Sequence, residues 1–408
     1  MSAMRILLLA LISYCGFATA AAPVVVKDPA KTGLDGERLA RIPERMKSFV
    51  DRGTMAGVVT LVARHGSIAA LDSVGFTDLE TKQSLQTDAI FQLHSMTKPV
   101  VAIAALMLSE EGRLAINDPV EKYLPEFRGM WVIDKQDESS RTLRRPSRPI
   151  TIRDLMTHTS GLPLNPPAGI GELHGALHKT LNEAVLVISQ QPLAFDPGTK
   201  WMYSNTGTAA LGRVIEVVSG ISFETFLETR IFKPLGMNDT HIYPPKEKFG
   251  RMPTAYILKD GKLLKYTSDP LGEGAMKFRV GAKYPLPEGG LYSTASDLFI
   301  LYQLMLNRGE YKGVRILSPA SVDSMTRVHT GDMKASGPGI GAGLGWTVVR
   351  DTAAAPLSIG TYGHGGRYGT YCFIDPVKDM IGIFLIHREG GSEERNAFVA
   401  MALASALD

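Results

Sequence analysis

Two side chains three residues apart, Ser95 and Lys98, offer the clearest chemistry in the sequence. Ser95 is the only serine with a lysine three positions later. The apolar run that follows, residues 99–112, predicts a buried helix whose first turn holds both residues. Residues three apart on a helix share one face, with Cβ atoms about 5–6 Å apart, so the lysine can assist removal of the serine proton. Because unpaired N–H groups at a helix N-terminus favour an anion, the same turn also supplies an oxyanion donor.

A tyrosine in the middle of the chain is a candidate acid or base. Tyr203 is the only tyrosine followed two positions later by an asparagine, Asn205. Turn-forming residues 195–202 precede it and an expected helix, residues 206–218, follows it, so we expect Tyr203 on a loop, where catalytic groups commonly lie. A tyrosine beside a lysine can titrate below its ordinary pKa of about 10 and serve as a general base. A turn tyrosine that caps a backbone group is the alternative interpretation.

A glycine-rich triplet near the C-terminus, His364-Gly365-Gly366, opens an expected β-hairpin over residues 371–387. Glycine at a strand entry allows a ligand to approach the backbone closely. A strand N–H near Gly366 and Arg367 is therefore a candidate second oxyanion donor, opposite the N–H of Ser95. A plain glycine-rich hairpin is the alternative.

These motifs occur in the order found in the serine β-lactamase and penicillin-binding-protein superfamily, and the chain resembles that superfamily. More closely, it resembles relatives of the class C β-lactamases and the family VIII carboxylesterases. The resemblance implies that Ser95 is acylated, that Lys98 and Tyr203 share the acid–base work, and that Asn205 orients the substrate and the lysine. Further segments match the family style, namely residues 152–161, 197–198, 231–237 and 289–298. His158, in the first of them, is expected to be a structural residue at a helix C-terminus.

The third motif departs from the pattern that the resemblance implies. Class C β-lactamases and DD-peptidases are expected to carry Lys-Thr-Gly there, where the lysine meets a substrate carboxylate. Here the position is occupied by His364 and two glycines, and histidine, with an ordinary pKa near 6.5, is mostly neutral at pH 7. Arg367 is the candidate for restoring a cation. The Lys31-Thr32-Gly33 of this chain precedes the first helix and is out of order. The resemblance implies His-x-Gly variants among esterases and D-aminopeptidases, which favours an esterase.

We therefore expect an exported serine hydrolase that cleaves carboxylic esters through an acyl-enzyme. Its substrate would be a small ester or amide, with no metal site and no organic cofactor. A β-lactamase, DD-carboxypeptidase or D-aminopeptidase acting on β-lactams or D-amino-acid peptides is the alternative among enzymes. An inactive protein that binds cell-wall peptides is the alternative of another class. The expected substrate-binding residues are Asn205, His364, Gly366 and Arg367.

The first 22 residues predict a signal peptide. Arg5 precedes an apolar run, residues 6–17, and small residues 18–20, the pattern of a bacterial export leader. We expect a periplasmic or secreted protein without stable membrane association after cleavage. The net charge of +3 argues against nucleic-acid binding. Removal of the leader would leave Cys372 as the only cysteine, so a large core must supply stability.

The order of elements predicts an α/β (α+β) fold in one hydrolase domain, residues 23–408. Strands at both ends indicate an α/β lobe of residues about 23–95 and 290–408, with a mainly helical lobe, about 96–289, inserted between. The resemblance implies a β-lactamase-like, five-stranded antiparallel sheet flanked by helices, with the site between the lobes. The basic segment 141–148 is expected to be a solvated loop, or alternatively a rim that steers anionic substrates. Other expected elements are helices at 36–52, 296–307 and 393–407 and strands at 58–63, 68–71 and 344–350.

Overall fold

The computed structural model describes residues 23–165, 178–266, 279–333, 335–354 and 356–407. The expected signal peptide, residues 1–22, lies outside these ranges. Within them, no helix has the length and apolar character needed to cross a membrane.

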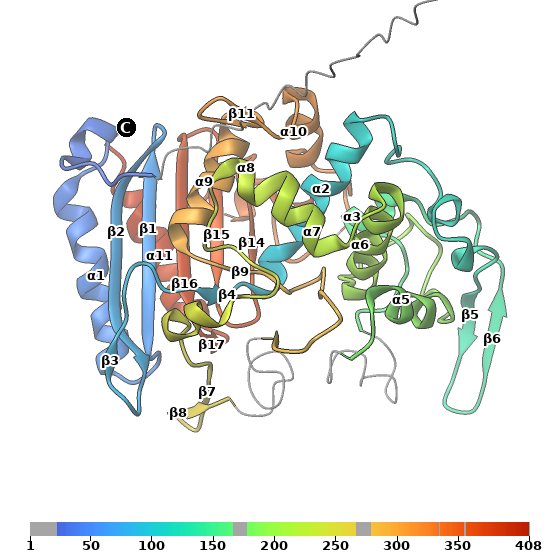
Figure 1. The fold of residues 1–408 in the computed structure, drawn as a ribbon, viewed down its shortest axis with the longest axis horizontal. Coiled ribbons are helices and arrows are strands. Elements are labelled where there is room, and N and C mark those ends of the chain that lie inside the picture. The colour runs from blue at the N-terminus through green and yellow to red at the C-terminus, as the bar shows by residue number, and fades with distance from the viewer. Residues whose placement is uncertain (1–22, 166–177, 267–278, 334, 355, 408) are drawn as a thin grey trace, which may run out of the picture.

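Both ends of the chain contribute strands to one antiparallel sheet. Strand β1 (Gly57–Arg64) pairs with β16 (Met380–Ile386), so the blue and red strands lie side by side in Figure 1. The other strands of this sheet are β2 (Ser67–Asp78), β3 (Gln83–Ser84), β12 (Ile340–Ala342), β13 (Thr347–Val349), β14 (Tyr362–Gly365) and β15 (Tyr371–Asp375). Their order is β12-β13-β14-β15-β16-β1-β2-β3. The expected fold, an antiparallel sheet with flanking helices, is confirmed.

The sheet has eight strands rather than the five that the resemblance implied. The short strand β3 extends one edge, and β12 and β13 extend the other. Strand β13 begins at Thr347, later than the predicted start at residue 344. The reason is a turn in which the Gly343 N–H donates to the carbonyl oxygen of Trp346, with Gly345 in the left-handed region at φ 78°.

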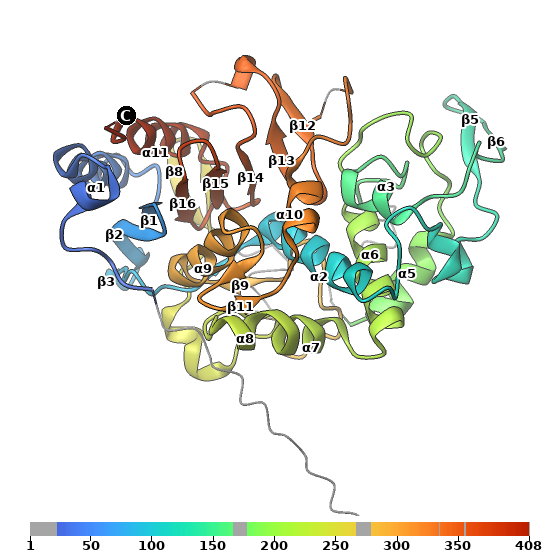
Figure 2. The ribbon, with the colours of Figure 1, turned by 90° about the horizontal axis from the view of Figure 1, so that it is seen from above.

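Alternate residues of β1 face two separate cores, as the pleat of a strand requires. Val58 packs in a core shared with α1 (Gly36–Asp51) and α11 (Ser392–Ala404). Its neighbour Val59 packs in the larger core, to which α9 (Ala295–Leu306) contributes. Figure 2 shows α1 and α11 on one face of the sheet and α9 on the opposite face. The apolar run of β1 is therefore explained by burial on both faces.

Most of the regular structure between the two parts of the sheet is helical. Its described helices are α2 (Lys98–Glu110), α3 (Ile152–Thr157), α5 (Leu181–Ser189), α6 (Asn205–Ser219), α7 (Phe223–Leu227) and α8 (Lys233–Leu235), with a π-helical turn at Glu228–Phe232. Helix α6 contacts α2, α3, α5 and α7 and so forms the centre of this lobe. The remaining elements are α10 (Pro319–Thr326) and the small strands β4 (Phe91–Gln92), β5 (Val132–Gln136), β6 (Arg141–Arg144), β7 (Tyr256–Lys259), β8 (Lys262–Lys265), β9 (Tyr292–Ser293), β10 (Glu310–Tyr311), β11 (Val314–Arg315) and β17 (Arg388–Glu389).

The basic segment that begins at Arg141 is exposed at its first four residues, as expected, but these residues form a strand rather than a loop. Its first four residues form β6, which pairs with β5 in a hairpin. Arg148, at the other end of the segment, is bound to the buried Asp154 with an N–O distance of 2.6 Å. The same carboxylate accepts from Thr151 in the capping box of α3. These contacts fasten this end of the segment to the helical lobe.

Candidate active site

Ser95 lies on a short 3-10 turn, His94–Thr97, that runs directly into α2. The expected helix is present, but its first regular residue is Lys98 rather than Ser95. Pro99 suits the first turn of α2, where a backbone N–H is not needed for the helix. The residues of α2 from Lys98 to Leu108 are all buried, so the serine is presented at the end of a helix fixed in the core.

Lys98 is the buried partner of the serine. Its residue surface is 2% exposed. Its Nζ lies 3.0 Å from Ser95 Oγ and 2.7 Å from the carbonyl oxygen of Glu288, to which it donates a hydrogen bond. The amine is therefore within proton-transfer distance of the hydroxyl.

Tyr203 lies on the loop directly before α6. Ser204, the N-cap of α6, accepts a hydrogen bond from the Gly207 N–H at 2.9 Å, which ties the loop to the start of the helix. The Tyr203 ring covers the lysine, with Lys98 Nζ 4.7 Å from the ring centroid. The structure thus brings together the three side chains that the sequence singled out for catalysis, Ser95, Lys98 and Tyr203.

His364, on β14, lies on another side of Tyr203, with ring centroids 6.2 Å apart. Its Nδ1 is 2.8 Å from the carbonyl oxygen of Gly365, so Nδ1 carries the proton of the neutral ring and Nε2 can accept. Burial, together with the charge of Lys98, lowers the pKa of His364 to about 4. At pH 7 the third motif therefore carries no cation at His364.

Gly366 serves the turn that follows β14. Its N–H donates to the carbonyl oxygen of Thr370 at 2.7 Å, and its own carbonyl oxygen accepts from the Gly369 N–H at 3.0 Å. Because the Gly366 N–H is used within the turn, Gly366 is not an oxyanion donor in this structure. Of the two residues considered for the second oxyanion donor, Gly366 and Arg367, the N–H of Arg367 therefore remains the prediction.

The guanidinium of Arg367 does not restore the missing lysine as an isolated cation. Its Nε lies 3.1 Å from Oε1 of Glu389, and a terminal nitrogen donates to the hydroxyl of Tyr266 at 2.9 Å. The side chain lines the cleft over Ser95. Its charge, however, is balanced by the neighbouring carboxylate.

In this structure the Asn205 side chain bonds a residue other than Lys98. Its Nδ2 donates to Oδ1 of Asn165 at 2.8 Å, and its backbone N–H donates to the carbonyl oxygen of Leu164. Lys98 Nζ instead donates to Ser95 Oγ and to the Glu288 carbonyl oxygen. As the first residue of α6, Asn205 engages the preceding loop rather than the lysine.

A cleft of about 440 Å³ opens over Ser95. Tyr203 and His364 line it, and Arg395, in the first turn of α11, contributes a second arginine to its wall. The Arg395 guanidinium lies 5.1 Å from the ring centroid of Tyr371. Among the ion pairs between residues that the structure describes, none includes Arg395. The cleft wall therefore carries a cation that no carboxylate balances within the described chain.

A second cavity, of about 250 Å³, lies in the helical lobe. Its two arginines already have protein partners, because Arg148 binds Asp154 and Arg145 lies 3.7 Å from the Trp131 ring centroid. Among the described residues that line this cavity, no nucleophile is hydrogen-bonded to a base. We therefore assign the chemistry to the cleft over Ser95.

Two residues of the cleft wall, His158 and Trp201, were not among the predicted site residues. His158 ends α3 in the left-handed region at φ 60°, which agrees with the expected role at a helix C-terminus. Its ring also lies 4.5 Å from that of Tyr203, and the ring of Trp201 lies 6.3 Å from Tyr203. The available signal was that both residues fall in or beside segments matching the family style.

The serine turn is held by a two-stranded ladder. Strand β4, which leads into the turn, pairs with β9. Just beyond the ladder, the Leu93 N–H donates to the Leu291 carbonyl oxygen at 2.8 Å, and the Leu291 N–H donates to Thr97 Oγ1 at 3.1 Å. The segment before β9 also supplies the Glu288 carbonyl oxygen that binds Lys98. One segment thus aligns both the serine turn and the lysine.

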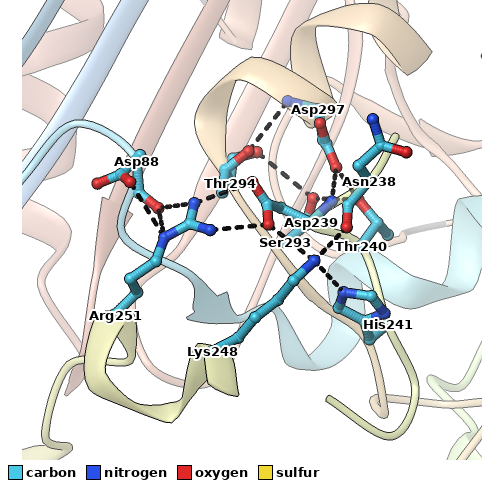
Figure 3. Close-up of polar contacts among 10 residues, drawn as sticks. All are labelled: Asp88, Asn238, Asp239, Thr240, His241, Lys248, Arg251, Ser293, Thr294 and Asp297. Carbon is cyan, nitrogen blue, oxygen red and sulfur yellow. Dashed lines mark hydrogen bonds and ion pairs between the residues drawn. The ribbon is translucent and has the colours of Figure 1, made fainter. Parts of the chain in front are cut away.

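A polar network anchors β9 to the surrounding loops (Figure 3). Oδ2 of the buried Asp297 accepts from the Asp239 N–H and the Thr240 hydroxyl, each at 2.8 Å. The Thr240 hydroxyl lies 2.8 Å from that of Ser293 on β9. Asp239 in turn binds Arg251 through contacts of 2.8 and 2.9 Å. The network joins two of the family-like segments, which fall at and just before these residues.

Comparisons with known proteins agree with this fold. The Beta-lactamase family model matches residues 42–406, so the chain belongs to the β-lactamase family. The chain is 32% identical over 377 residues to Esterase EstB of Burkholderia gladioli, covering 85% of this chain and 90% of EstB. The structure of EstCE1, described as a hydrolase with promiscuous acyltransferase activity, superposes with a TM-score of 0.78 at 25% identity, covering 91% of this chain and 98% of EstCE1.

A penicillin-binding protein homologue has the same fold. This octameric homologue from Pyrococcus abyssi superposes with a TM-score of 0.68 at 25% identity, covering 90% of this chain and 77% of that one. The resemblance inferred from the motifs is confirmed, and the chain is a serine hydrolase of the β-lactamase fold.

Proposed function

We propose that this protein cleaves carboxylic esters through an acyl-enzyme on Ser95. The observation that carries the proposal is the 3.0 Å contact between Ser95 Oγ and Lys98 Nζ inside a cleft. In the third motif, a neutral His364 stands where a cation would be expected to bind the carboxylate of a β-lactam or peptide. The similarity to Esterase EstB supports an ester as the substrate.

In this proposal, Lys98 and Tyr203 accept the proton of Ser95 as its Oγ attacks the ester carbonyl carbon. The oxyanion of the tetrahedral intermediate accepts hydrogen bonds from the N–H groups of Ser95 and Arg367. As the ester C–O bond breaks, the alcohol takes a proton from Tyr203 and the acyl group stays on Ser95. A water molecule then attacks the acyl carbonyl carbon and gives its proton to the same pair. As the bond between Ser95 Oγ and the acyl carbon breaks, Ser95 Oγ takes that proton back and the acid is released.

A second candidate function, hydrolysis of β-lactams or D-amino-acid peptides, is favoured by Arg395. A cation on the cleft wall without a carboxylate partner in the described chain would suit a substrate that bears its own carboxylate. Arg395 approaches the cleft from α11. The lysine of a Lys-Thr-Gly motif would instead lie on β14, at the position of His364. The two candidate functions therefore differ in whether Arg395 contributes to substrate binding.

Steady-state hydrolysis of p-nitrophenyl butyrate and of nitrocefin by the same preparation distinguishes the candidates. Rapid ester turnover with little nitrocefin turnover would support the esterase. Efficient nitrocefin turnover that falls in Arg395→Gln would support the β-lactamase instead. Loss of both activities in Ser95→Ala, with unchanged thermal unfolding, is the control for the nucleophile.

We also propose that the chain is exported. The proposal rests on the leader-like residues 1–22 of the sequence. Cell fractionation of the full chain, compared with a variant carrying Leu8→Arg in the apolar run, tests it. Recovery of both in the same fraction would contradict export.

A further inference from the structure

We propose that His158 is a positioning residue for Tyr203, holding the tyrosine ring against the serine–lysine pair. The inference rests on the proposed function, because it assigns His158 a role in the same acyl transfer. It assigns a positioning role to the segment around His158, which matches the family style but has no part in the mechanism above.

His158 forms hydrogen bonds with the backbone on both sides of Tyr203 and also contacts the Tyr203 ring. The Met202 N–H donates to the His158 carbonyl oxygen at 2.9 Å, and the Ser204 N–H donates to His158 Nδ1 at 3.2 Å. Between these two bonds, the imidazole packs on the Tyr203 ring with centroids 4.5 Å apart and planes tilted by 37°. One residue therefore fixes the backbone before and after the tyrosine and one face of its side chain.

Two nitrogen-bearing groups lie close to the Tyr203 ring. Lys98 Nζ is 4.7 Å from the ring centroid, and the His158 imidazole is at 4.5 Å. Without the imidazole, the tyrosine ring would lose a packing surface beside an open cleft of about 440 Å³. Its hydroxyl would then be held less firmly in the position that the proposed proton transfers require.

The hydrogen bonds of His158 define the tautomer of its neutral ring. Because Nδ1 accepts from a backbone N–H, the neutral ring carries its proton on Nε2. Burial, followed by the charge of Lys98 and by His364, lowers the pKa of His158 well below its ordinary value. A protonated ring would lose the bond from Ser204, so the neutral form is the one that holds the loop.

The backbone of His158 is also constrained. The residue has φ 60° and ψ 35°, a left-handed conformation that asparagine tolerates better than most residues. Such conformations persist where the surroundings fix them and are often found at functional sites. Here Asp154 does this, because its carbonyl oxygen accepts from the His158 and Thr159 N–H groups. The constrained helix end delivers the imidazole to Tyr203.

The test is a double-mutant cycle between His158→Ala and Tyr203→Phe, measured as kcat and KM for p-nitrophenyl butyrate. A displacement of about 1 Å of a catalytic group lowers rates by about 100-fold, so we expect His158→Ala to lower kcat by that factor with little change in KM. In the Tyr203→Phe background the same change should have less than about a 3-fold effect, because the hydroxyl to be positioned is gone. Multiplicative effects of the two changes would overturn the inference.

His158→Asn keeps an acceptor for the Ser204 N–H and suits the left-handed backbone. It should therefore restore kcat to within about 10-fold of the natural protein, since a positioned acceptor replaces the lost one. If His158→Asn were as slow as His158→Ala at equal thermal stability, the role assigned to the acceptor would be wrong. His329→Ala is the matched control, because His329 bonds the Ser324 carbonyl oxygen at 2.7 Å and is not among the cleft residues. It should leave kcat unchanged.

Failure of the inference is separable from failure of the proposed function. If Tyr203→Phe alone kept the natural rate, the acid–base role of Tyr203 would fail and the cycle would have no basis. If Tyr203→Phe were slow but the effect of His158→Ala persisted beside it, the inference alone would fail. Labelling of Ser95 by a fluorophosphonate gives a second rate for variants too slow in turnover.

Discussion

The carbonyl oxygen of Leu93 lies where a side chain on Gly366 would have to be. A Cβ built on Gly366 would approach this oxygen to 2.3 Å and the Thr370 hydroxyl to 2.1 Å. Leu93 is two residues before Ser95, so the turn after β14 is in contact with the backbone that carries the serine. The relative positions of the two proposed oxyanion donors, the N–H groups of Ser95 and Arg367, therefore depend on the close approach of Gly366 to the Leu93 backbone.

Gly366→Ala should consequently inactivate the protein. The clash involves a backbone oxygen, so the turn or the serine segment must move, and we expect kcat to fall by about 100-fold or more. Gly365→Ala is the matched control, because the nearest atom to a Cβ there is 3.6 Å away, an ordinary contact. Steady-state hydrolysis of p-nitrophenyl butyrate measures both. Equal rates for the two variants would contradict the close approach.

Removal of the carboxylate beside Arg367 should improve recognition of anionic esters. In Glu389→Gln the Arg367 guanidinium keeps the Tyr266 hydroxyl but loses the negative charge of Glu389, so KM for a monoester of a dicarboxylic acid should fall. Both side chains are partly exposed, so we expect only about a 3-fold effect, and none on a neutral ester. Glu393→Gln, which removes a carboxylate bound to Arg52 at 3.2 Å, is the control. A similar change in KM for both variants would show a general charge effect.

The preference for neutral over anionic esters should not change between pH 5 and pH 8. His364 has a pKa of about 4, so it stays neutral over this range and adds no cation as the pH falls. A histidine with its ordinary pKa near 6.5 would instead favour anionic esters below pH 6.5. The ratio of kcat/KM for matched neutral and anionic esters, measured across the range, decides the point. A rise in the relative rate of the anionic ester toward pH 5 would show that His364 becomes charged.

Asp297 should make the protein less stable as the pH rises toward 7. Burial raises the pKa of this carboxyl to about 6, from 3.8. The folded protein therefore binds this proton more tightly than the unfolded chain does. The stabilisation is fully present below about pH 4 and is lost as the pH rises through about 6.

Asp297→Asn removes this titration and keeps an acceptor for Thr240. The free energy of unfolding of the natural protein, relative to the variant, should fall between pH 4 and pH 7, by up to about 3 kcal/mol. Urea unfolding at several pH values measures the difference. A difference that stays constant with pH would contradict the raised pKa.

Sequence reasoning succeeded where the functional groups are close in the chain or belong to a recognisable order. Ser95 and Lys98 are one turn apart, so local geometry alone brings them together. Tyr203 lies far along the sequence, and its approach to Lys98 was foreseen through the resemblance. The strand at 58–63 was equally visible as an apolar run.

It failed where a side chain is directed by a distant partner. Asn165 holds Asn205, Glu389 balances Arg367, and Thr370 takes the N–H of Gly366. No spacing rule predicts such partners. The edge strands β3 and β12 are two and three residues long, too short for a hydrophobic alternation to show them.

The helix-end interpretation of His158 was correct but incomplete. Its left-handed backbone conformation is the one expected at a helix C-terminus. Its contact with Tyr203 joins two loops distant in the sequence, so only the folded chain reveals it.

The covalent intermediate is the most direct test of the central claim. After rapid mixing with p-nitrophenyl butyrate and acid quenching, intact-protein mass spectrometry should show the chain gaining one butyryl group, and peptide mapping should place that group on Ser95. Ser95→Ala should gain none and should not hydrolyse the ester. A butyryl group on another residue, or full ester hydrolysis by Ser95→Ala, would contradict the account.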